Sequence, residues 1–309
     1  MLDLAIIGGG PAGLTAGLYA TRGGLDKVTM FEMGMPGGQI TGSSEIENYP
    51  GQSKIMTGME LMEKWPQQCE QFGLNHEMNQ VIQVTKEGDI FTLVLADGTK
   101  QEAKAVLLAT GSVPKRAGFK AESEFFGRGI STCATCDGFF YKNKEVAVIG
   151  GGDTALEEAV YLAKLCSKVY IVHRRDTYKS APSTIAHMKA ANNIEEVTNV
   201  TVEEVYGDKT GVLGLKLKSK IDDSIRDLEV PGVFVFVGRD VLSDSFKQDN
   251  DSYLCGVNDR TEIIVDLKMR TNIPGLYAAG DVRIDAAKQV VCAAADGATA
   301  AIDIIEYLQ

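Results

Sequence analysis

Short apolar runs alternate with glycine-rich turns and helical patterns along the chain. Residues 2–7 and 145–149 are apolar without alternation, which is typical of strands buried on both faces of a sheet. Each run leads into a glycine triplet and then into a segment with apolar residues at helical spacing. Residues 27–32 and 168–172 then have the pattern of further strands. The order strand, turn, helix, strand, found twice, predicts an α/β fold.

The rest of the pattern predicts further elements and a domain boundary. Residues 114–126 have the composition of a connector, and we expect the boundary there. The predicted elements are a helix over 57–72 kinked by Pro66, strands over 78–95 and 104–109, mostly strands over 194–237, a polar loop over 240–260, and an alanine-rich helix from about 286 to 307.

The first glycine turn, Gly8-Gly9-Gly10-Pro11-Ala12-Gly13, lies between a predicted strand and a predicted helix. A bare G-x-G-x-x-G also occurs in ordinary turns, but here Glu32 follows about twenty residues later, at the end of the next strand. Such glycines let the backbone approach a pyrophosphate at the helix N-terminus, while the acid accepts from a ribose hydroxyl. The predicted nucleotide contacts are Gly8, Gly10, Pro11, Ala12, Gly13 and Glu32.

The second turn, Gly150-Gly151-Gly152-Asp153-Thr154-Ala155, repeats the first. When the halves are aligned with one deletion, Glu32 corresponds to His173, which Arg174 and Arg175 follow. An acid at this position reads free ribose hydroxyls, as in FAD, whereas a basic cluster neutralises the 2′-phosphate of NADP(H). The alternative is a solvated basic turn. The predicted second-site contacts are Gly150, Gly152, Asp153, Thr154, Ala155, His173, Arg174 and Arg175. The predicted fold therefore contains two Rossmann-like domains.

Composition narrows the class of protein. The 309 residues suffice for two domains, and the net charge of −11 argues against a nucleic-acid or anionic-membrane partner. The N-terminus lacks the basic region of a signal peptide, and no apolar run reaches the ~18 residues of a membrane helix. Six cysteines, mostly scattered, do not form a secreted disulfide framework. We expect a cytoplasmic protein.

The segment Cys133-Ala134-Thr135-Cys136-Asp137-Gly138 is the candidate redox centre. A Cys-x-x-Cys pair can close a small disulfide, which a two-electron donor opens to a thiolate that attacks another disulfide. A structural zinc site is the alternative, but it needs four ligands, and the chain has three histidines and no second such pair. We therefore expect no metal. The remaining cysteines are predicted to be structural: Cys69, Cys166, Cys255 and Cys292.

These motifs together resemble the low-molecular-weight, bacterial-type thioredoxin reductases of the pyridine nucleotide-disulfide oxidoreductase class. The resemblance runs nearly end to end, and the Cys-Ala-Thr-Cys-Asp-Gly segment is its most specific part. Its other carriers are the two glycine turns, Gly37-Gly38-Gln39, Glu47-Asn48-Tyr49-Pro50-Gly51, Ala109-Thr110-Gly111, His173-Arg174-Arg175 and Gly280-Asp281.

The resemblance implies an FAD domain of residues 1–113 and 244–309, with an NADPH domain of residues 114–243 inserted into it. It implies a homodimer that passes electrons from NADPH through FAD to the cysteine pair and on to thioredoxin. Cys136 would lie next to the flavin, Cys133 would attack thioredoxin, and Asp137 would handle their protons. The NADPH domain would rotate on hinges near 112–117 and 238–244.

The resemblance also implies further cofactor contacts. Those for FAD are Gly37, Gly38, Gln39, Ile40, Thr41, Asn48, Thr110, Gly111, Gly280, Asp281, Lys288, Gln289 and Val290; those for NADPH include Lys179 and Gly238. The chain departs from the family at three points: Lys179 and Lys288 stand where Arg is common, and Arg239-Asp240 replaces Pro-Asn. A lysine contacts a phosphate without the bidentate geometry of arginine.

Other functions remain as alternatives. A ferredoxin/flavodoxin-NADP reductase shares the fold but lacks the cysteine pair, and a reductase of another thioredoxin-like protein would share both. A peroxiredoxin-reducing flavoprotein would carry a redox domain before Gly8. A redox sensor would bind the nucleotides without turnover.

Overall fold

A computed structural model describes residues 1–43, 46 and 48–309, and its chain divides into two compact units. Unit 1 comprises Met1–Val113 and Asp240–Gln309, and unit 2 comprises Pro114–Arg239. The chain therefore leaves unit 1 once and returns to it, with the return between Arg239 and Asp240, where the sequence suggested 243–244. Glu47, part of one quoted motif, lies outside the described residues.

Unit 1 combines a mixed sheet with helices. Its elements are β1 (Leu2–Ile7), α1 (Pro11–Arg22), β2 (Val28–Phe31), η1 (Gln39–Gly42), α2 (Gly58–Met62), α3 (Trp65–Gln71), β3 (Asn75–Glu77), β4 (Val81–Glu87), β5 (Ile90–Leu95), β6 (Lys100–Leu108), β7 (Ser112–Pro114, whose last residue belongs to unit 2), β16 (Arg239–Val241, whose first residue belongs to unit 2), η3 (Asp244–Phe246), β17 (Leu276–Ala278) and α8 (Val290–Leu308).

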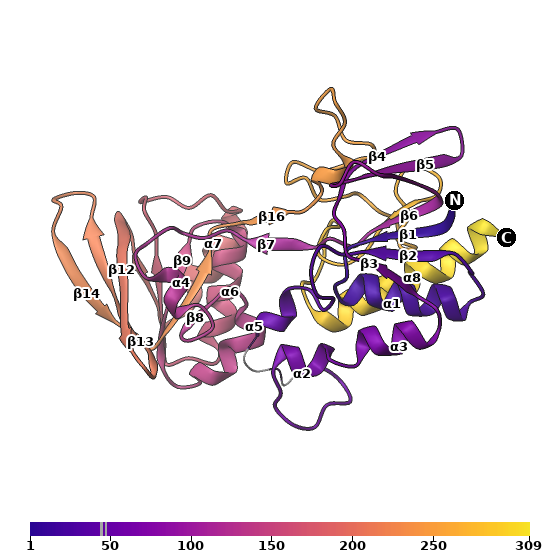
Figure 1. Ribbon diagram of the computed structural model, residues 1–309. Coiled ribbons are helices and arrows are strands. Elements are labelled where there is room, and N and C mark those ends of the chain that lie inside the picture. Colours follow the sequence, from indigo (N-terminus) through magenta and orange to yellow (C-terminus); the bar gives the residue numbers. More distant parts are fainter. Residues whose placement is uncertain (44–45, 47) are drawn as a thin grey trace. The chain divides into compact units, whose positions relative to one another are not determined.

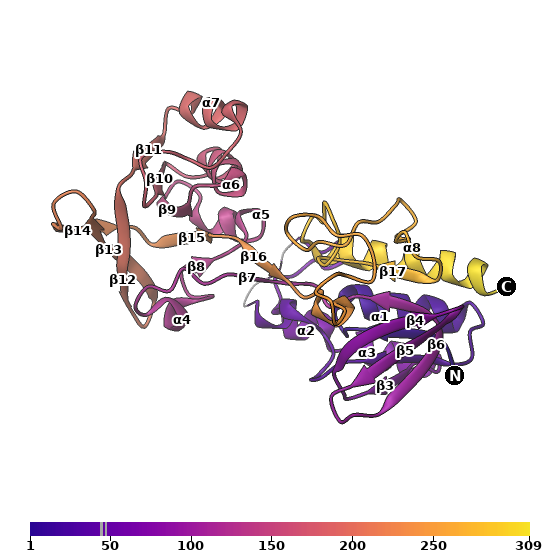
Figure 2. The same ribbon diagram turned by 90° about the horizontal axis from the view of Figure 1, so that it is seen from above.

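The sheet of unit 1 has the order β3-β2-β1-β6-β5-β4, and β17 pairs with the end of β6 (Figures 1 and 2). Strands β1, β2, β3, β6 and β17 run parallel, while β4 and β5 form an antiparallel hairpin that continues from β6. Both faces are buried: Leu4 and Ile6 pack in the core with α1 and α8, and Ala5 and Ile7 in the core of the opposite face. This explains why β1 is apolar without alternation.

Unit 2 repeats this plan. Its elements are α4 (Glu122–Phe125), β8 (Ile130–Ser131), α5 (Ala134–Asp137), η2 (Gly138–Tyr141), β9 (Glu145–Gly150), α6 (Asp153–Ala163), β10 (Lys168–Val172), α7 (Pro182–Ala190), β11 (Ile194–Val197), β12 (Val200–Asp208), β13 (Gly211–Ser219), β14 (Ile225–Glu229) and β15 (Gly232–Phe236).

The parallel sheet of unit 2 has the order β11-β10-β9-β15-β8, and β12, β13 and β14 form a separate antiparallel sheet (Figure 2). Val146 and Val148 of β9 pack with α6, whereas Ala147 and Ile149 pack in the core that contains β12 and β13. In each unit the strand order reverses beside the strand that precedes a glycine turn, which is where open α/β sheets bind ligands.

The two connections between the units are paired with each other. β7 and β16 form a two-stranded sheet, Leu242 N–H donates to Gly111 O (3.0 Å) and Lys115 N–H donates to Gly238 O (3.0 Å). These are the stretches in which the hinges were predicted, and a hinge motion there stays a prediction.

Two predicted helices were wrong in their extent. The helix predicted over 57–72 is two helices, because Pro66 lies in the first turn of α3, where its missing N–H is tolerated, and α2 ends at Met62. The alanine-rich helix begins at Val290 rather than near 286, because Asp285 and Lys288 have left-handed backbone angles (φ 53° and 56°).

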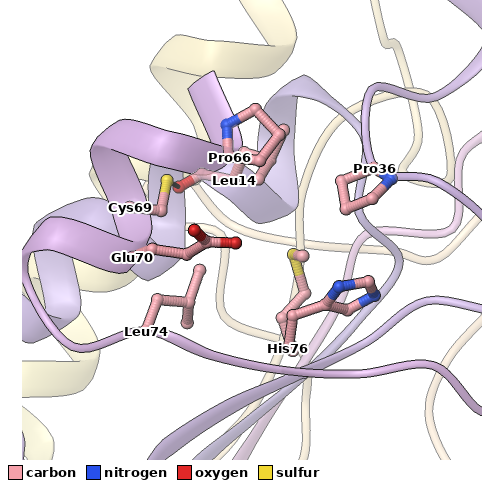
Figure 3. A pocket seen from close by; sticks show the side chains of 8 residues that line it. Leu14, Pro36, Pro66, Cys69, Glu70, Leu74 and His76 are labelled. Atoms are coloured by element: carbon pink, nitrogen blue, oxygen red, sulfur yellow. Dashed lines mark hydrogen bonds between the residues drawn. The ribbon is translucent and has the colours of Figure 1, made fainter. Parts of the chain in front are cut away.

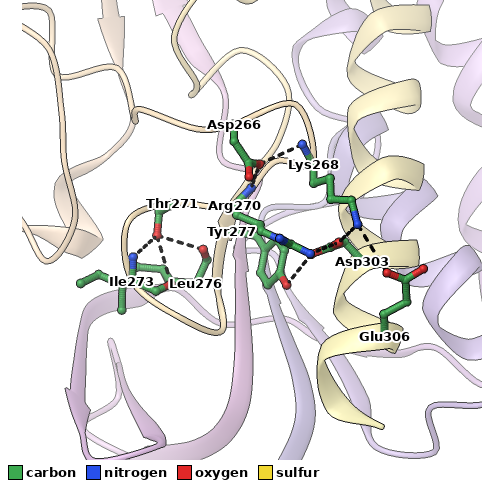
Figure 4. A network of polar contacts seen from close by, with 9 residues as sticks. All are labelled: Asp266, Lys268, Arg270, Thr271, Ile273, Leu276, Tyr277, Asp303 and Glu306. Carbon is green, nitrogen blue, oxygen red and sulfur yellow. Dashed lines mark hydrogen bonds and ion pairs between the residues drawn. The ribbon is translucent and has the colours of Figure 1, made fainter.

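A buried carboxylate fastens α8 to unit 1 (Figure 4). Asp303, whose side chain is 3% exposed, accepts hydrogen bonds from the Arg270 guanidinium and from the Tyr277 hydroxyl (2.9 Å), and Lys268 Nζ lies 2.9 Å away. Burial alone would raise the pKa of Asp303, but these donors outweigh it and lower the pKa to about 2. The cluster therefore stabilises the fold through the ionised form of Asp303.

This carboxylate predicts a specific loss of stability in acid. The pKa of Asp303 is lower in the folded state than in the unfolded state. Its contribution to the free energy of unfolding is therefore fully present above the unfolded pKa near 4, and it is lost as the pH falls to the folded pKa of about 2. The shift corresponds to about 2 kcal/mol. We expect the free energy of unfolding, measured by urea denaturation from pH 6 to pH 2, to fall less with pH in Asp303→Asn than in the wild type. Equal slopes would contradict this role.

Candidate functional site

The first glycine turn joins β1 to α1 and needs glycine at two of its positions. Gly8 has φ 106°, and a Cβ there would lie 2.5 Å from Ala109 O. A Cβ at Gly13 would lie 1.9 Å from Gly8 O. The N-cap residue Gly10 has no side-chain cap, so the first N–H groups of α1 stay available to an anion. The turn therefore has room for a dinucleotide phosphate, and its binding of one stays a prediction.

Glu32 at the first turn and His173 at the second turn occupy equivalent positions in the two units. Glu32 lies over Gly9, whose N–H donates to its Oε2 (2.8 Å), and its Oε1 accepts from Gly34 N–H (3.1 Å). The His173 ring lies over Gly151, where an added Cβ would be 2.2 Å from its Cε1. The sequence alignment of Glu32 with His173 thus matches the geometry, and only the chemistry of the side chain differs.

Gly37, Gly38, Gln39, Ile40 and Thr41 lie next to the first turn. Gly37 N–H donates to Gly9 O (2.8 Å), and a Cβ at Gly38 would lie 2.9 Å from the Cα of Gly10. The Thr41 hydroxyl donates to Gly38 O (2.8 Å), and the Gln39 amide donates to Ser112 O. The structure thus brings this predicted group of residues to the N-terminal end of α1.

Gly280, from the C-terminal part of the predicted flavin set, also lies against this turn. Gly280 approaches Ala12, since a Cβ there would lie 3.1 Å from that of Ala12, and Asp281 follows directly. Asn48 Nδ2 donates to Gln289 Oε1 (3.2 Å) at the start of α8, where Val290 is the first residue. Thr110 Oγ1 donates to Leu242 O (2.5 Å), after β6.

Two further members of this set have hydrogen bonds to other parts of the chain. Gly111 O accepts the Leu242 N–H at the connection between the units. Lys288 Nζ donates to Ala286 O (3.3 Å) and has an exposed side chain.

One residue that orders this region was missed. Asp296 of α8 is 8% exposed, accepts from the Gly280 N–H (3.1 Å) and binds the Arg283 guanidinium through both oxygens (2.7 and 2.9 Å). It thereby fixes the turn that carries Asp281. An acid in the alanine-rich run was the only signal in the sequence, and nothing indicated its partner.

The second turn joins β9 to α6 in the same way. Gly150 has φ 157°, and a Cβ there would lie 2.5 Å from Phe236 O and 2.6 Å from the Cβ of Ala155. Gly152, like Gly10, caps its helix without a side chain, and the exposed Thr154 follows in the first turn of α6. Gly238 (φ 113°) lies in the return connection.

The charge of the second site comes from arginine and lysine rather than histidine. Burial lowers the pKa of His173, and the nearby Arg174 and Arg175 lower it further. The ring stacks on Tyr178, with 5.4 Å between centroids. The side chains of three cationic residues are exposed: Arg174, Arg175 and Lys179. An exposed cationic group is accessible to a phosphate and can form a charge-assisted hydrogen bond with it.

Unit 2 also carries a disulfide between Cys133 and Cys136 (S–S 2.08 Å). It lies at α5, for which Cys133 is the N-cap residue and whose Cys136 N–H donates to Cys133 Sγ (3.2 Å). Cys136 is exposed and Cys133 is half-buried. Asp137, the predicted acid/base, ends the same short helix.

A second residue that the sequence analysis missed is Ser131. Its hydroxyl donates to Asp137 Oδ2 (2.5 Å) and accepts from the Cys133 N–H (3.0 Å), and it lies 3.3 Å from Cys133 O. It is buried at the end of β8 and ties the acid to the backbone of the redox turn. Serines are common near turns, so its position gave no signal.

Three of the other cysteines are buried free thiols: Cys69, Cys166 and Cys255. Cys69 donates to Leu14 O (3.2 Å), and burial raises its pKa to about 11. It borders a cavity of about 10 Å³ with His76, Glu70 and Pro36 (Figure 3), which is room for no more than a water molecule. Burial also raises the pKa of Cys166 to about 11 and of Cys255 to about 12.

Within residues 1–43, 46 and 48–309, no cluster of three or more His, Cys, Asp or Glu side chains is arranged to hold a metal ion. Over the same residues, no helix combines the length and the apolar character needed to cross a bilayer.

Comparison with known proteins shows full-length similarity. A family model described as pyridine nucleotide-disulphide oxidoreductase matches residues 2–297. The chain is 57% identical over 309 residues to a thioredoxin reductase of Helicobacter pylori (100% of this chain, 99% of the relative) and 40% identical over 307 residues to one of Listeria monocytogenes (99% and 94%).

A solved structure of thioredoxin reductase from Streptococcus pyogenes superposes with a TM-score of 0.93 and 35% identity, covering 100% of this chain and 98% of that one. These similarities confirm the predicted fold class and the predicted resemblance. Because the family model covers nearly the whole sequence, the chain belongs to the pyridine nucleotide-disulphide oxidoreductase family.

Proposed function

We propose that the protein is an NADPH-dependent flavoprotein that reduces the disulfide of thioredoxin. The observation that carries this proposal is the Cys133–Cys136 disulfide, which lies in the same compact unit as the second nucleotide turn. The full-length identity to curated thioredoxin reductases supports the choice of protein substrate. A cytoplasmic location and a homodimer remain predictions from the sequence.

The two glycine turns are the proposed cofactor sites. The N–H groups at the start of α1 would hold the pyrophosphate of FAD, and Glu32 would accept from its ribose. The turn before α6 would hold NADPH, with Arg174, Arg175 and Lys179 at its 2′-phosphate. Bound FAD would supply a group that accepts hydride from NADPH and delivers two electrons to the disulfide.

The chain's own residues then carry out the thiol chemistry. Two electrons and two protons open the Cys133–Cys136 bond to a dithiol, and Asp137, held by Ser131, exchanges these protons. The Cys136 N–H directed at Cys133 Sγ stabilises a thiolate on Cys133.

Transfer to the substrate completes the cycle. The Cys133 thiolate attacks the thioredoxin disulfide, forms a mixed disulfide and releases one substrate thiolate. Cys136 then attacks Cys133 Sγ, which restores the disulfide and releases reduced thioredoxin with its two thiols.

An anaerobic NADPH titration followed by visible absorbance tests this function. We expect a yellow protein that takes up about four electrons per flavin, two by the flavin and two by the disulfide. Uptake of about two electrons would make the cysteine pair a bystander and would favour a ferredoxin-type reductase. A colourless protein that does not bind added FAD would refute both functions.

A further inference from the structure

The basic segment after β10 begins and ends at the second glycine turn. It begins at His173, whose ring lies over Gly151. It returns at Lys179, whose N–H donates to Gly151 O (2.8 Å) and which forms a parallel bridge with Gly152. The exposed side chain of Lys179 is therefore held beside the turn by contacts of its backbone, and the position of that backbone sets where its charge lies.

The carboxylate of Asp153 fixes Ser180 and Ala181, the two residues that follow Lys179. As the first residue of α6, Asp153 accepts from the Ser180 hydroxyl (2.6 Å) and from the Ala181 N–H (2.8 Å), both through Oδ1. Ala181 is the N-cap of α7, which packs against α6. One carboxylate oxygen thus joins the starts of two helices and anchors the chain immediately after Lys179.

The charge of Asp153 is unfavourable for a direct contact with the nucleotide. A carboxylate at a helix N-terminus suits the helix dipole, but it repels a phosphate bound at the same helix end. The corresponding residue of the first turn is Pro11, which has no charge and holds no such segment. An acid at this position therefore occurs only in the turn that has the basic cluster. Its hydrogen bonds are made with Ser180 and Ala181 of the protein itself.

We propose that Asp153 is a positioning residue that holds Lys179 at the second turn and thereby strengthens the preference of that site for a 2′-phosphate. This inference rests on the proposed NADPH function and changes the role predicted for Asp153 from a nucleotide contact to a tether. Loss of the tether lets the 179–181 segment move away from Gly151, so binding of a 2′-phosphate weakens while binding of the rest of the nucleotide does not.

Calorimetric titration of the flavin-loaded enzyme with adenosine 2′,5′-bisphosphate and with AMP tests the tether. We expect Asp153→Ala to weaken binding of the bisphosphate by about tenfold, the effect of losing hydrogen bonds to a charged group, and binding of AMP by less than about twofold. Asp153→Asn keeps an accepting oxygen and should keep the wild-type preference for the bisphosphate over AMP, although loss of the repelling charge strengthens the binding of both ligands. Arg174→Ala is the positive control, and Asp176→Ala, which removes an exposed acid from the same segment, is the matched control.

Each outcome has one meaning. A wild type without preference for the bisphosphate would refute the NADPH assignment itself. A wild-type preference that Asp153→Ala retains would overturn the tether, and so would an equal loss in Asp153→Asn, because charge would then be responsible. If Asp153→Ala does not fold, Ser180→Ala replaces it: a smaller loss of preference supports the tether, and an unchanged preference overturns it.

Discussion

Replacement of Cys136 by serine is expected to abolish NADPH-dependent thioredoxin reduction while leaving flavin content and flavin reduction by NADPH unchanged. A hydroxyl cannot form the Cys133–Cys136 bond, so the two electrons have no acceptor in unit 2. The residues proposed for FAD lie in unit 1 and keep their contacts. We expect activity to fall by more than about a thousandfold, as when other covalent catalysts lose their nucleophile, and uptake of NADPH electrons to fall from about four to about two per flavin.

The control for this variant is Cys166→Ala, which removes a buried thiol from the same unit. Its high pKa makes Cys166 inert at neutral pH, so the control should keep full activity and the uptake of four electrons per flavin. Thioredoxin reduction by Cys136→Ser near the wild-type rate would show that the disulfide lies off the electron path. The assays are insulin reduction coupled to thioredoxin, and the anaerobic titration.

The repeated fold could be predicted because the backbone geometry of each glycine turn, and of the strand before it, allows only certain residue types. Only glycine fits at Gly8 and Gly13, where a Cβ would meet backbone oxygens, and the strand before each turn must be apolar on both faces. These constraints appear in the sequence as G-x-G-x-x-G after a non-alternating run. The alignment of Glu32 with His173 followed from the same repeat, because both side chains lie over the middle glycine.

The residues that were missed act through contacts that have no recognisable sequence pattern. Asp296 meets Arg283 and Gly280 only after the chain folds back from β17 to α8. Ser131 contacts Cys133 and Asp137 within one local turn, but serines are common near turns. The start of α8 was misplaced for a related reason. Asp285 and Lys288 adopt left-handed angles that composition does not reveal, since Ala286, Ala287 and the alanine-rich sequence after Lys288 favour a longer helix.

Gly13→Ala is expected to destroy flavin binding, because the first turn has no room for a methyl group. The new Cβ would lie 1.9 Å from the O of Gly8, which follows β1 and whose N–H donates to Phe31 O (2.9 Å). Helix α1 has no room to retreat, since Gly297 of α8 comes so close that a Cβ there would lie 2.1 Å from Ala12 O. We expect a loss of about 3 kcal/mol in the stability of unit 1, the upper end for overpacking, and purified protein nearly free of flavin.

The second turn supplies the matched control, because Ala155 stands at the position of Gly13 and its methyl group is fully buried. Ala155→Gly should cost about 1 kcal/mol, as glycine does in a helix, and should leave the flavin content unchanged. Flavin released by acid denaturation measures occupancy per chain, and urea denaturation measures stability. A Gly13→Ala protein with wild-type flavin content would contradict the close approach of α1 to Gly8. The two substitutions exchange the residues of the repeated turns, so loss of flavin in Gly13→Ala and not in Ala155→Gly would show that the flavin depends on the close fit of the first turn.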